Sequence, residues 1–172
     1  ECFESRVVQL AIAPVESRVI VEHVVSVFFW GCVRSFDRDL AMGACELFKC
    51  NLWYINHLAS ICDLMSKGFI NEAIMKEALK SMISIHESRF MNMIDDLTDH
   101  QISLLKAVLD GVVKFSASDV IEKYRLNSSA NVRRVKDALR KKEVITFNEK
   151  DEPVILDPLF EYWLENYYFA KQ

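Results

Sequence analysis

The sequence contains no G-x-x-x-x-G-K-[ST] pattern, the glycine-rich loop whose backbone N–H groups hold nucleotide phosphates. No apolar, strand-like run ends in the paired acidic residues that would hold Mg²⁺. These absences exclude a self-contained nucleotide hydrolase. We therefore expect the 172 residues not to be an enzyme and to bind no cofactor by themselves.

Long hydrophobic runs are missing as well. The longest apolar run, from Val24 to Val33, is far shorter than the ~20 residues that a membrane-spanning helix requires. We therefore expect no membrane partner. The hydrophobic content of 51% is still sufficient for packed cores, and the length of 172 residues allows one large domain or two small ones.

Cysteines occur only near the start of the sequence and lack the spacing of zinc sites. The five are Cys2, Cys32, Cys45, Cys50 and Cys62. Their odd number and their apolar neighbours indicate reduced thiols and a cytoplasmic protein. The candidate metal ligands would be Cys45, Cys50, His57 and Cys62. None has C-x₂-C spacing, and two of the cysteines fall on apolar helical stripes, so we expect no metal site.

Strong positive charge is also absent. The net charge is −4, with 9 Lys/Arg against 13 Asp/Glu in residues 1–97 and 12 against 12 in residues 98–172. A dedicated nucleic-acid-binding module usually carries a pronounced positive charge. The composition therefore does not favour such a module.

The segment 116–156 has the pattern of two helices followed by a β-hairpin. Ser116 or Ser118 is expected to cap the first helix, which the residues 125–127 interrupt. A second helix is expected over 130–142, capped by the serines before it, because apolar residues recur at helical spacing. The expected strands and the charged tip between them are residues 145–147, 154–156 and 148–152.

The flanks of this segment complete a winged-helix pattern over residues 97–172. Thr98 and Gln101 have the spacing of a capping box, which predicts a helix that ends near Gly111. Asp157 and Pro158 predict the start of a last, strongly apolar helix that packs back onto the core.

The region before residue 97 is predicted to be mainly helical. Residues 1–15 suggest the end of a larger core, with a strand that stops at Pro14. Four helices are expected in residues 16–96: from Glu16 to Trp30 with Gly31 as its stop, from Asp37 to about Cys50, from Asn51 to Lys67, and from Asn71 towards Met93. Arg18 and Glu22 have the spacing of an ion pair within the first of them. The predicted fold class is therefore mainly α: a four-helix domain followed by a winged helix with a small β-hairpin.

The candidate functional residues lie on the predicted helix 130–142. Arg133, Arg134, Arg140 and Lys141 share its polar face and have the charge to contact DNA phosphates or base edges. Asp137 lies in the middle of the same face, which is also the pattern of a solvated helix surface. Trp53 and Tyr54 have a similar ambiguity between a ligand pocket and an ordinary core.

Three stretches resemble the C-terminal end of the archaeal-type P-loop ATPases, a family of the AAA+/STAND kind that is also found in bacteria. They read LTDHQISLLKAVLDG, DVIEKYRLNSSANVRRVKDALRKKEVI and ILDPLFEYWLENY. The preceding stretch NLWYINHLASICDLMSKGFINEAIMKEALKSMI is similar to the helical lid of that family. In the family a nucleotide-binding core is followed by a lid and then by a winged helix.

The resemblance implies a regulatory segment whose position depends on the nucleotide bound by an upstream core. That core is the expected partner of the segment. ATP and Mg²⁺ would be bound by that core. Arg6 matches the position of a phosphate-sensing arginine, although Glu-Ser stands before it where the family usually has Gly. Leu156 stands where related STAND proteins have a histidine that contacts ADP, so that contact does not carry over. The alternatives are a DNA-binding winged helix, as in origin-recognition relatives, and a module that binds another protein.

Overall fold

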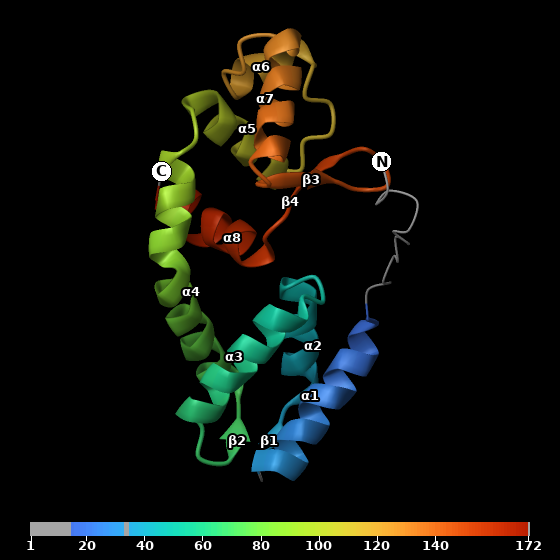
Figure 1. The fold of residues 1–172 in the computed structure, drawn as a ribbon, viewed down its shortest axis with the longest axis vertical. Helices are drawn as coiled ribbons and strands as arrows, with labels where there is room; N and C mark the ends of the chain where they lie inside the picture. The colour runs from blue at the N-terminus through green and yellow to red at the C-terminus, as the bar shows by residue number, and fades with distance from the viewer. Residues whose placement is uncertain (1–14, 33–34, 172) are drawn as a thin grey trace, which may run out of the picture. The chain divides into compact units, whose positions relative to one another are not determined.

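In the computed structural model of this chain, the described backbone covers residues 15–32 and 35–171, and the described side chains cover 15–27 and 37–170. The chain divides into two compact units, one that ends at Glu72 and one that begins at Ala73. Both are mainly helical, and the strands form two short pairings within the described ranges, which confirms the predicted fold class (Figure 1). Arg6 and the expected strand in residues 1–15 lie outside the described residues. Among the described helices, none is long and apolar enough to cross a membrane.

The first unit is built from helices separated by short turns. They are α1 (Ser17–Cys32), α2 (Arg38–Leu47) and α3 (Leu52–Met65). The side chain of Asp37 caps α2 by accepting hydrogen bonds from Asp39 N and Leu40 N at 2.8 and 3.2 Å. Asn51 caps α3 in the same way, through Trp53 N and Tyr54 N. Both caps were predicted, because a short polar side chain before an apolar periodic run satisfies free N–H groups.

The ends and partners of α1 differ from the sequence-based expectation. The valine-rich stretch is a helix, as predicted, but it continues through Gly31 to Cys32. One glycine costs a helix only about 1 kcal/mol, so it does not stop a helix by itself. Glu22 pairs with Arg38, at 2.6 and 2.9 Å, and not with Arg18 as predicted. A guanidinium–carboxylate pair with two parallel hydrogen bonds is stronger than an ion pair between neighbours along one helix.

Two features of the first unit were not predicted. β1 (Ser35–Phe36) pairs in parallel with β2 (Phe69–Ile70), and two-residue strands are too short to leave a sequence pattern. Tyr54 is buried in the core, whereas Trp53 is 59% exposed. On α3 the buried stripe is Ile55, Leu58, Ala59 and Cys62, whereas Met65 at the end of the helix is exposed.

The second unit begins with the long helix α4 (Glu72–Asp95). Its other helices and strands are α5 (Asp99–Leu109), α6 (Ser118–Lys123), α7 (Ser129–Lys141), β3 (Ile145–Phe147), β4 (Pro153–Ile155) and α8 (Pro158–Trp163). The order from α5 to α8 is that of the predicted winged helix. On α4, Ile83 is buried and Ile85 is exposed.

The caps and the hairpin of this unit follow the prediction with small shifts. Gln101 Oε1 accepts a hydrogen bond from Thr98 N at 3.0 Å, as a capping box requires. Neither Ser116 nor Ser118 caps α6, because Ala117 occupies the N-cap position. The antiparallel strands pair Ile145 with Ile155 and Phe147 with Pro153, which moves the second strand one residue towards the tip. Pro153 is tolerated there because it lies at the end of the ladder.

The last helix packs onto the core through a cluster of aromatic rings. Asp157 caps α8 by accepting from Leu159 N and Phe160 N at 3.0 and 3.1 Å. Phe160 and Trp163 on α8 lie 5.4 and 5.5 Å, between ring centroids, from Phe90 on α4. The helix then changes to a π-helical turn, Leu164–Tyr168.

The C-terminal half of α4 is therefore part of the core of the second unit. Phe90 is fully buried and Ile94 is 5% exposed. Arg89 Nη2 forms an ion pair of 2.6 Å with Asp157 Oδ2, and Lys142 Nζ donates to the carbonyl oxygen of Asp96. The predicted domain boundary at residues 96/97 would separate α4 from these partners. That boundary stays a prediction, whereas the compact units divide before Ala73.

Replacement of Phe90 by alanine tests this packing. We expect Phe90→Ala to lower the free energy of unfolding by about 3–5 kcal/mol, because it removes a ring from a closed aromatic cluster. Urea denaturation followed by circular dichroism measures the change. Met91→Ala is the matched control, since Met91 lies on the same helix with 41% of its surface exposed. Equal effects of the two substitutions would contradict the assignment of Phe90 to this core.

Candidate functional site

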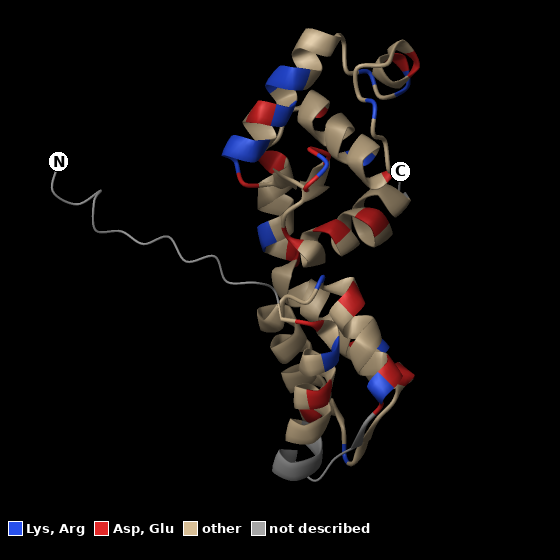
Figure 2. Ribbon diagram, turned by 90° about the vertical axis from the view of Figure 1, so that its right-hand side faces the viewer, with Lys and Arg blue, Asp and Glu red and all other residues tan. Residues whose placement is uncertain are grey.

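The four predicted cations lie on one exposed surface of α7. Val132, Val135 and Leu139 face the core, and the side chains of Arg133, Arg134, Arg140 and Lys141 are exposed. Figure 2 shows blue bands of Lys and Arg residues and a red band of Asp or Glu along this helix. Within residues 35–171, Arg133, Asp137 and Arg140 take part in no ion pair. The face thus carries a net positive charge that is open to solvent.

Asn131 fixes the start of this helix to the turn before it. Its side chain is buried, and its Nδ2 donates to the carbonyl oxygen of Leu126 at 2.9 Å. Its Oδ1 accepts from Arg134 Nη2 at 2.8 Å. Its backbone N–H donates to Ser128 Oγ at 3.2 Å, so Ser128 is the predicted N-cap. One asparagine therefore ties together the turn, the cap and one of the candidate arginines.

The turn between α6 and α7 has an unusual backbone. Arg125 and Asn127 have positive φ angles of 53° and 72°, which side chains other than glycine adopt rarely. The carbonyl oxygen of Arg125 lies 3.1 Å from His100 Nδ1 on α5. Because a carbonyl oxygen only accepts, the histidine carries its proton on Nδ1 in this contact. The turn is thus held from both sides, by α5 and by α7.

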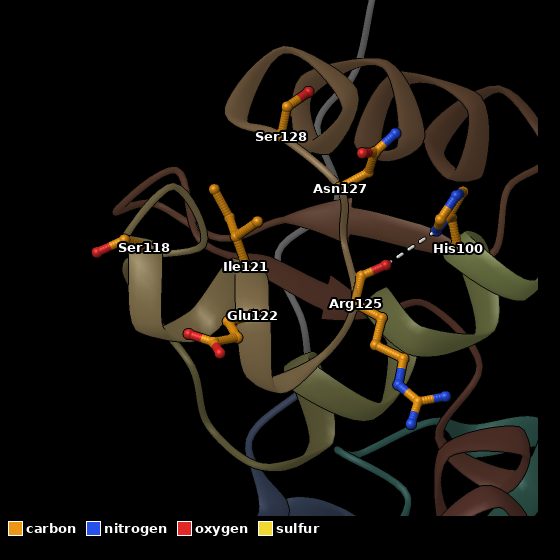
Figure 3. A pocket seen from close by; sticks show the side chains of 7 residues that line it. All are labelled: His100, Ser118, Ile121, Glu122, Arg125, Asn127 and Ser128. Carbon is orange, nitrogen blue, oxygen red and sulfur yellow. Dashed lines mark hydrogen bonds between the residues drawn. The ribbon is translucent and has the colours of Figure 1, made fainter.

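Two open hollows flank the turn. The larger has a volume of about 590 Å³ and is lined by His100, Ser118, Ile121, Glu122, Arg125, Asn127 and Ser128. Figure 3 shows the labelled side chains of α5 and α6 placed around the turn, with the contact from His100 to Arg125 drawn as a dashed line. A smaller hollow of about 320 Å³ shares Asn127 and Ser128 and includes Arg134. The first of these linings mixes cationic, anionic and neutral groups, so neither sign of ligand charge is selected there.

The wing between β3 and β4 is acidic, and Asn148 closes its turn with hydrogen bonds. Asn148 Oδ1 accepts hydrogen bonds from Lys150 N and Glu152 N at 3.0 and 2.9 Å. Asn148 Nδ2 donates to Glu152 Oε2 at 2.9 Å. The tip carries Glu149, Asp151 and Glu152 against the single cation Lys150. A carboxylate-rich wing repels a phosphate backbone.

Lys136 connects α7 electrostatically to the wing. Burial lowers the pKa of Lys136, and the negative charge of Asp151 opposes that decrease. Lys136 Nζ also lies 4.1 Å from the centroid of the Phe115 ring, within the range of a cation–π interaction. Part of the positive charge of α7 is therefore used inside the unit and does not face an external ligand.

The other predicted site residues are the candidate metal ligands and Arg6. In the described part of the chain, no group of three or more His, Cys, Asp or Glu residues is arranged to hold a metal ion. Cys45 and Cys62 are fully buried on the core stripes where they were expected. Arg6, the candidate phosphate sensor, lies outside the described residues. The role of Asn131 was not predicted, although its spacing of four residues from Val135 places it on the inward face.

Comparison with known proteins agrees with this geometry. A family model described as a probable winged helix domain matches residues 88–166. The match begins just before Phe90, so it includes the end of α4 as well as α5 to α8. The second unit therefore contains a winged helix domain. Comparisons with curated proteins and with solved structures give no significant match.

Substitutions at Asn131 test the turn. We expect Asn131→Ala to lower the free energy of unfolding by about 0.5–1.5 kcal/mol, because the Leu126 carbonyl oxygen loses one of its two donors and keeps only Ser128 N. Asn131→Asp should behave similarly, since it keeps the acceptor for Arg134 and loses the donor for Leu126. Arg134→Ala, which removes only the exposed partner, should change the value by no more than about 0.5 kcal/mol. Chemical denaturation of the three variants measures the free energy of unfolding. If Asn131→Asp leaves that value unchanged, the proposed role of the hydrogen bond to Leu126 is wrong.

Proposed function

We propose that the chain is the C-terminal regulatory segment of an ATPase of the AAA+/STAND kind and has no catalytic residues of its own. In this proposal the helical region before residue 97 is the lid, and the winged helix changes position with the nucleotide state of an upstream core. That core binds ATP and Mg²⁺ and is the main partner of the segment. The protein acts in the cytoplasm. The starting point is the resemblance of the LTDHQISLLKAVLDG and ILDPLFEYWLENY stretches to that family.

The packing of α4 is the observation that carries the proposal. The ring of Phe90 packs against the rings of Phe160 and Trp163, and Arg89 forms an ion pair with Asp157 at the start of α8. A helix that enters the winged helix core in this way transmits a displacement to the whole domain, because packed cores move as rigid bodies. The 24-residue helix α4 is continuous from Glu72, directly after β2 and Asn71. A change at its first turns is therefore carried into the winged helix.

The charge distribution also supports a protein partner. Residues 98–172 carry 12 basic and 12 acidic residues, and the wing is acidic. Balanced surfaces of this kind suit contact with another protein surface more than contact with a polyanion. The coding sequence upstream of Glu1 gives a direct test. A P-loop in the same reading frame would support the proposal, and a reading frame without one would overturn it.

Nucleotide binding by the isolated chain is the biochemical test. We expect no micromolar binding of ATP or ADP, with or without Mg²⁺, because the sequence has no phosphate-binding loop. Isothermal titration calorimetry measures binding, and thermal unfolding provides a second readout. A ligand at 100 times its Kd would stabilise the folded state by about 2.7 kcal/mol, so the absence of a shift is informative. Micromolar affinity in the isolated chain would contradict the proposal.

The second candidate function is binding of duplex DNA. It is favoured by the exposed face of α7, where Arg133, Arg134, Arg140 and Lys141 surround only one acidic residue. The second helix of a helix–turn–helix is the element that enters the major groove in such proteins. Asp137 and the acidic wing act against this function, and Asn131 holds Arg134 close to the turn.

A charge-reversal experiment separates the two functions. With two or three usable phosphate contacts, the chain should bind duplex DNA at about 10⁻⁴ M or more weakly at physiological salt. The double variant Arg133→Glu/Arg134→Glu should then change the affinity for DNA, measured by fluorescence anisotropy, no more than a control double variant does. The control is Arg18→Glu/Lys67→Glu, which changes the net charge by the same amount but lies in the first unit. Sub-micromolar binding that only the first double variant abolishes would make the winged helix a DNA reader and overturn the regulatory proposal.

A further inference from the structure

The end of α2 brings two cysteines together. Lys49 N donates to the carbonyl oxygen of Glu46 at 3.1 Å, and Cys50 N donates to the carbonyl oxygen of Cys45 at 2.8 Å. These two bonds are the pair that defines a Schellman motif, in which the third-last helical residue meets the second residue beyond the cap. Cys45 and Cys50 occupy these two positions. Their side chains therefore take the places where the motif usually forms a hydrophobic contact.

The backbone geometry limits how far apart the two cysteines lie. With standard bond lengths, the 2.8 Å hydrogen bond allows a Cα–Cα separation of at most about 6.7 Å. Disulfides in proteins have Cα–Cα separations of about 4.4–6.8 Å. The helix end thus keeps the two Cα atoms within the separation that a disulfide can span before any oxidation. Lys49 and Cys50 adopt positive φ angles of 49° and 59° to reach this arrangement.

The two thiols differ in access. Both are free, but Cys45 is fully buried and Cys50 is only half-buried. Burial raises the pKa of Cys45, and the neighbouring Cys50 and Glu46 raise it further, so the two sulfurs influence each other. A reagent in solution therefore meets Cys50 first, and Cys45 reacts only with a group that is already inside the turn.

We propose that Cys45 and Cys50 form a dithiol site that reacts reversibly with small-molecule disulfides. The Cys50 thiolate attacks one sulfur of the disulfide, and the first small thiol leaves. Cys45 then loses its proton and attacks Cys50 Sγ, and the second small thiol leaves. The two cysteines are oxidised by two electrons, and the small-molecule disulfide is reduced to two thiols.

The product closes a covalent ring around the turn that leads from α2 to α3. This ring contains Phe48, which is fully buried, and Lys49. In a reducing compartment the pair stays as two thiols, and it closes when the ratio of disulfide to thiol rises. The site is independent of the proposed ATPase role, so failure of one leaves the other standing.

Tryptic mapping of the full chain tests the proposal with oxidised glutathione as the probe. Trypsin cuts after Arg38, Lys49 and Lys67, which places Cys45 in peptide 39–49 and Cys50 in peptide 50–67. After oxidation and alkylation of the remaining thiols, we expect these two peptides to be joined and to separate on reduction. This joined pair should exceed any pair that contains Cys62 by about tenfold, because Cys62 is buried and inert.

Three variants identify which cysteine sulfurs form the disulfide. Cys62 shares peptide 50–67 with Cys50, and burial raises its pKa to about 11. Cys62→Ser should keep the joined peptides, and Cys50→Ser should lose them. Cys45→Ser should stop at a glutathione adduct on Cys50. Circular dichroism checks the fold of each variant, and the map of the unsubstituted chain decides the question even if Cys45→Ser does not fold.

Three results would overturn the proposal. The first is a lasting glutathione adduct on Cys50 in the unsubstituted chain, because it would show that Cys45 does not reach the mixed disulfide. The second is the absence of any reaction at Cys50 under conditions that oxidise a small dithiol. The third is a joined pair of peptides that persists in Cys50→Ser and vanishes in Cys62→Ser, because the bond would then involve Cys62 and not Cys50.

Discussion

The contact of Phe90 with Phe160 and Trp163 is the constraint on which the second unit depends. Three large rings from the ends of this unit, with centroids 5.4 to 5.9 Å apart, close a core that no single stretch of the helix–turn–helix supplies. Aromatic pairs at such distances contribute beyond their buried area. The winged helix therefore includes the end of α4, which agrees with a family match that starts at residue 88.

Short polar side chains hold the turns of this unit in place. Asn131 fixes the turn before α7, Asn148 fixes the wing, and Asp157 both caps α8 and receives Arg89. Each makes at least two hydrogen bonds, and each uses at least one of them for a backbone group. The shape of the surface around α7 is thus set by internal contacts. Its basic face and the acidic wing are presented together, which makes the domain electrically mixed rather than uniformly positive.

A different kind of constraint acts at the end of α2. There the backbone alone brings Cys45 and Cys50 together, because the last carbonyl groups of a helix require donors from the residues that follow. The opposite demand, for acceptors of the first N–H groups, is met at the start of α3 by the side chain of Asn51. The backbone geometry at these helix ends is therefore fixed by hydrogen bonds. At the end of α2 this geometry places two cysteines next to each other.

The sequence by itself determined what depends on neighbouring residues. Capping at Asp37, Thr98 and Asp157, the helical spacing in α7 and the strand–turn–strand pattern of the wing are local, so they were predicted within about two residues. Only the tertiary structure decided the non-local partners. Glu22 pairs with Arg38, β1 pairs with β2, and Phe90 joins the core of the winged helix. These choices depend on which elements pack together, and the sequence pattern of one element does not contain the identity of its partner.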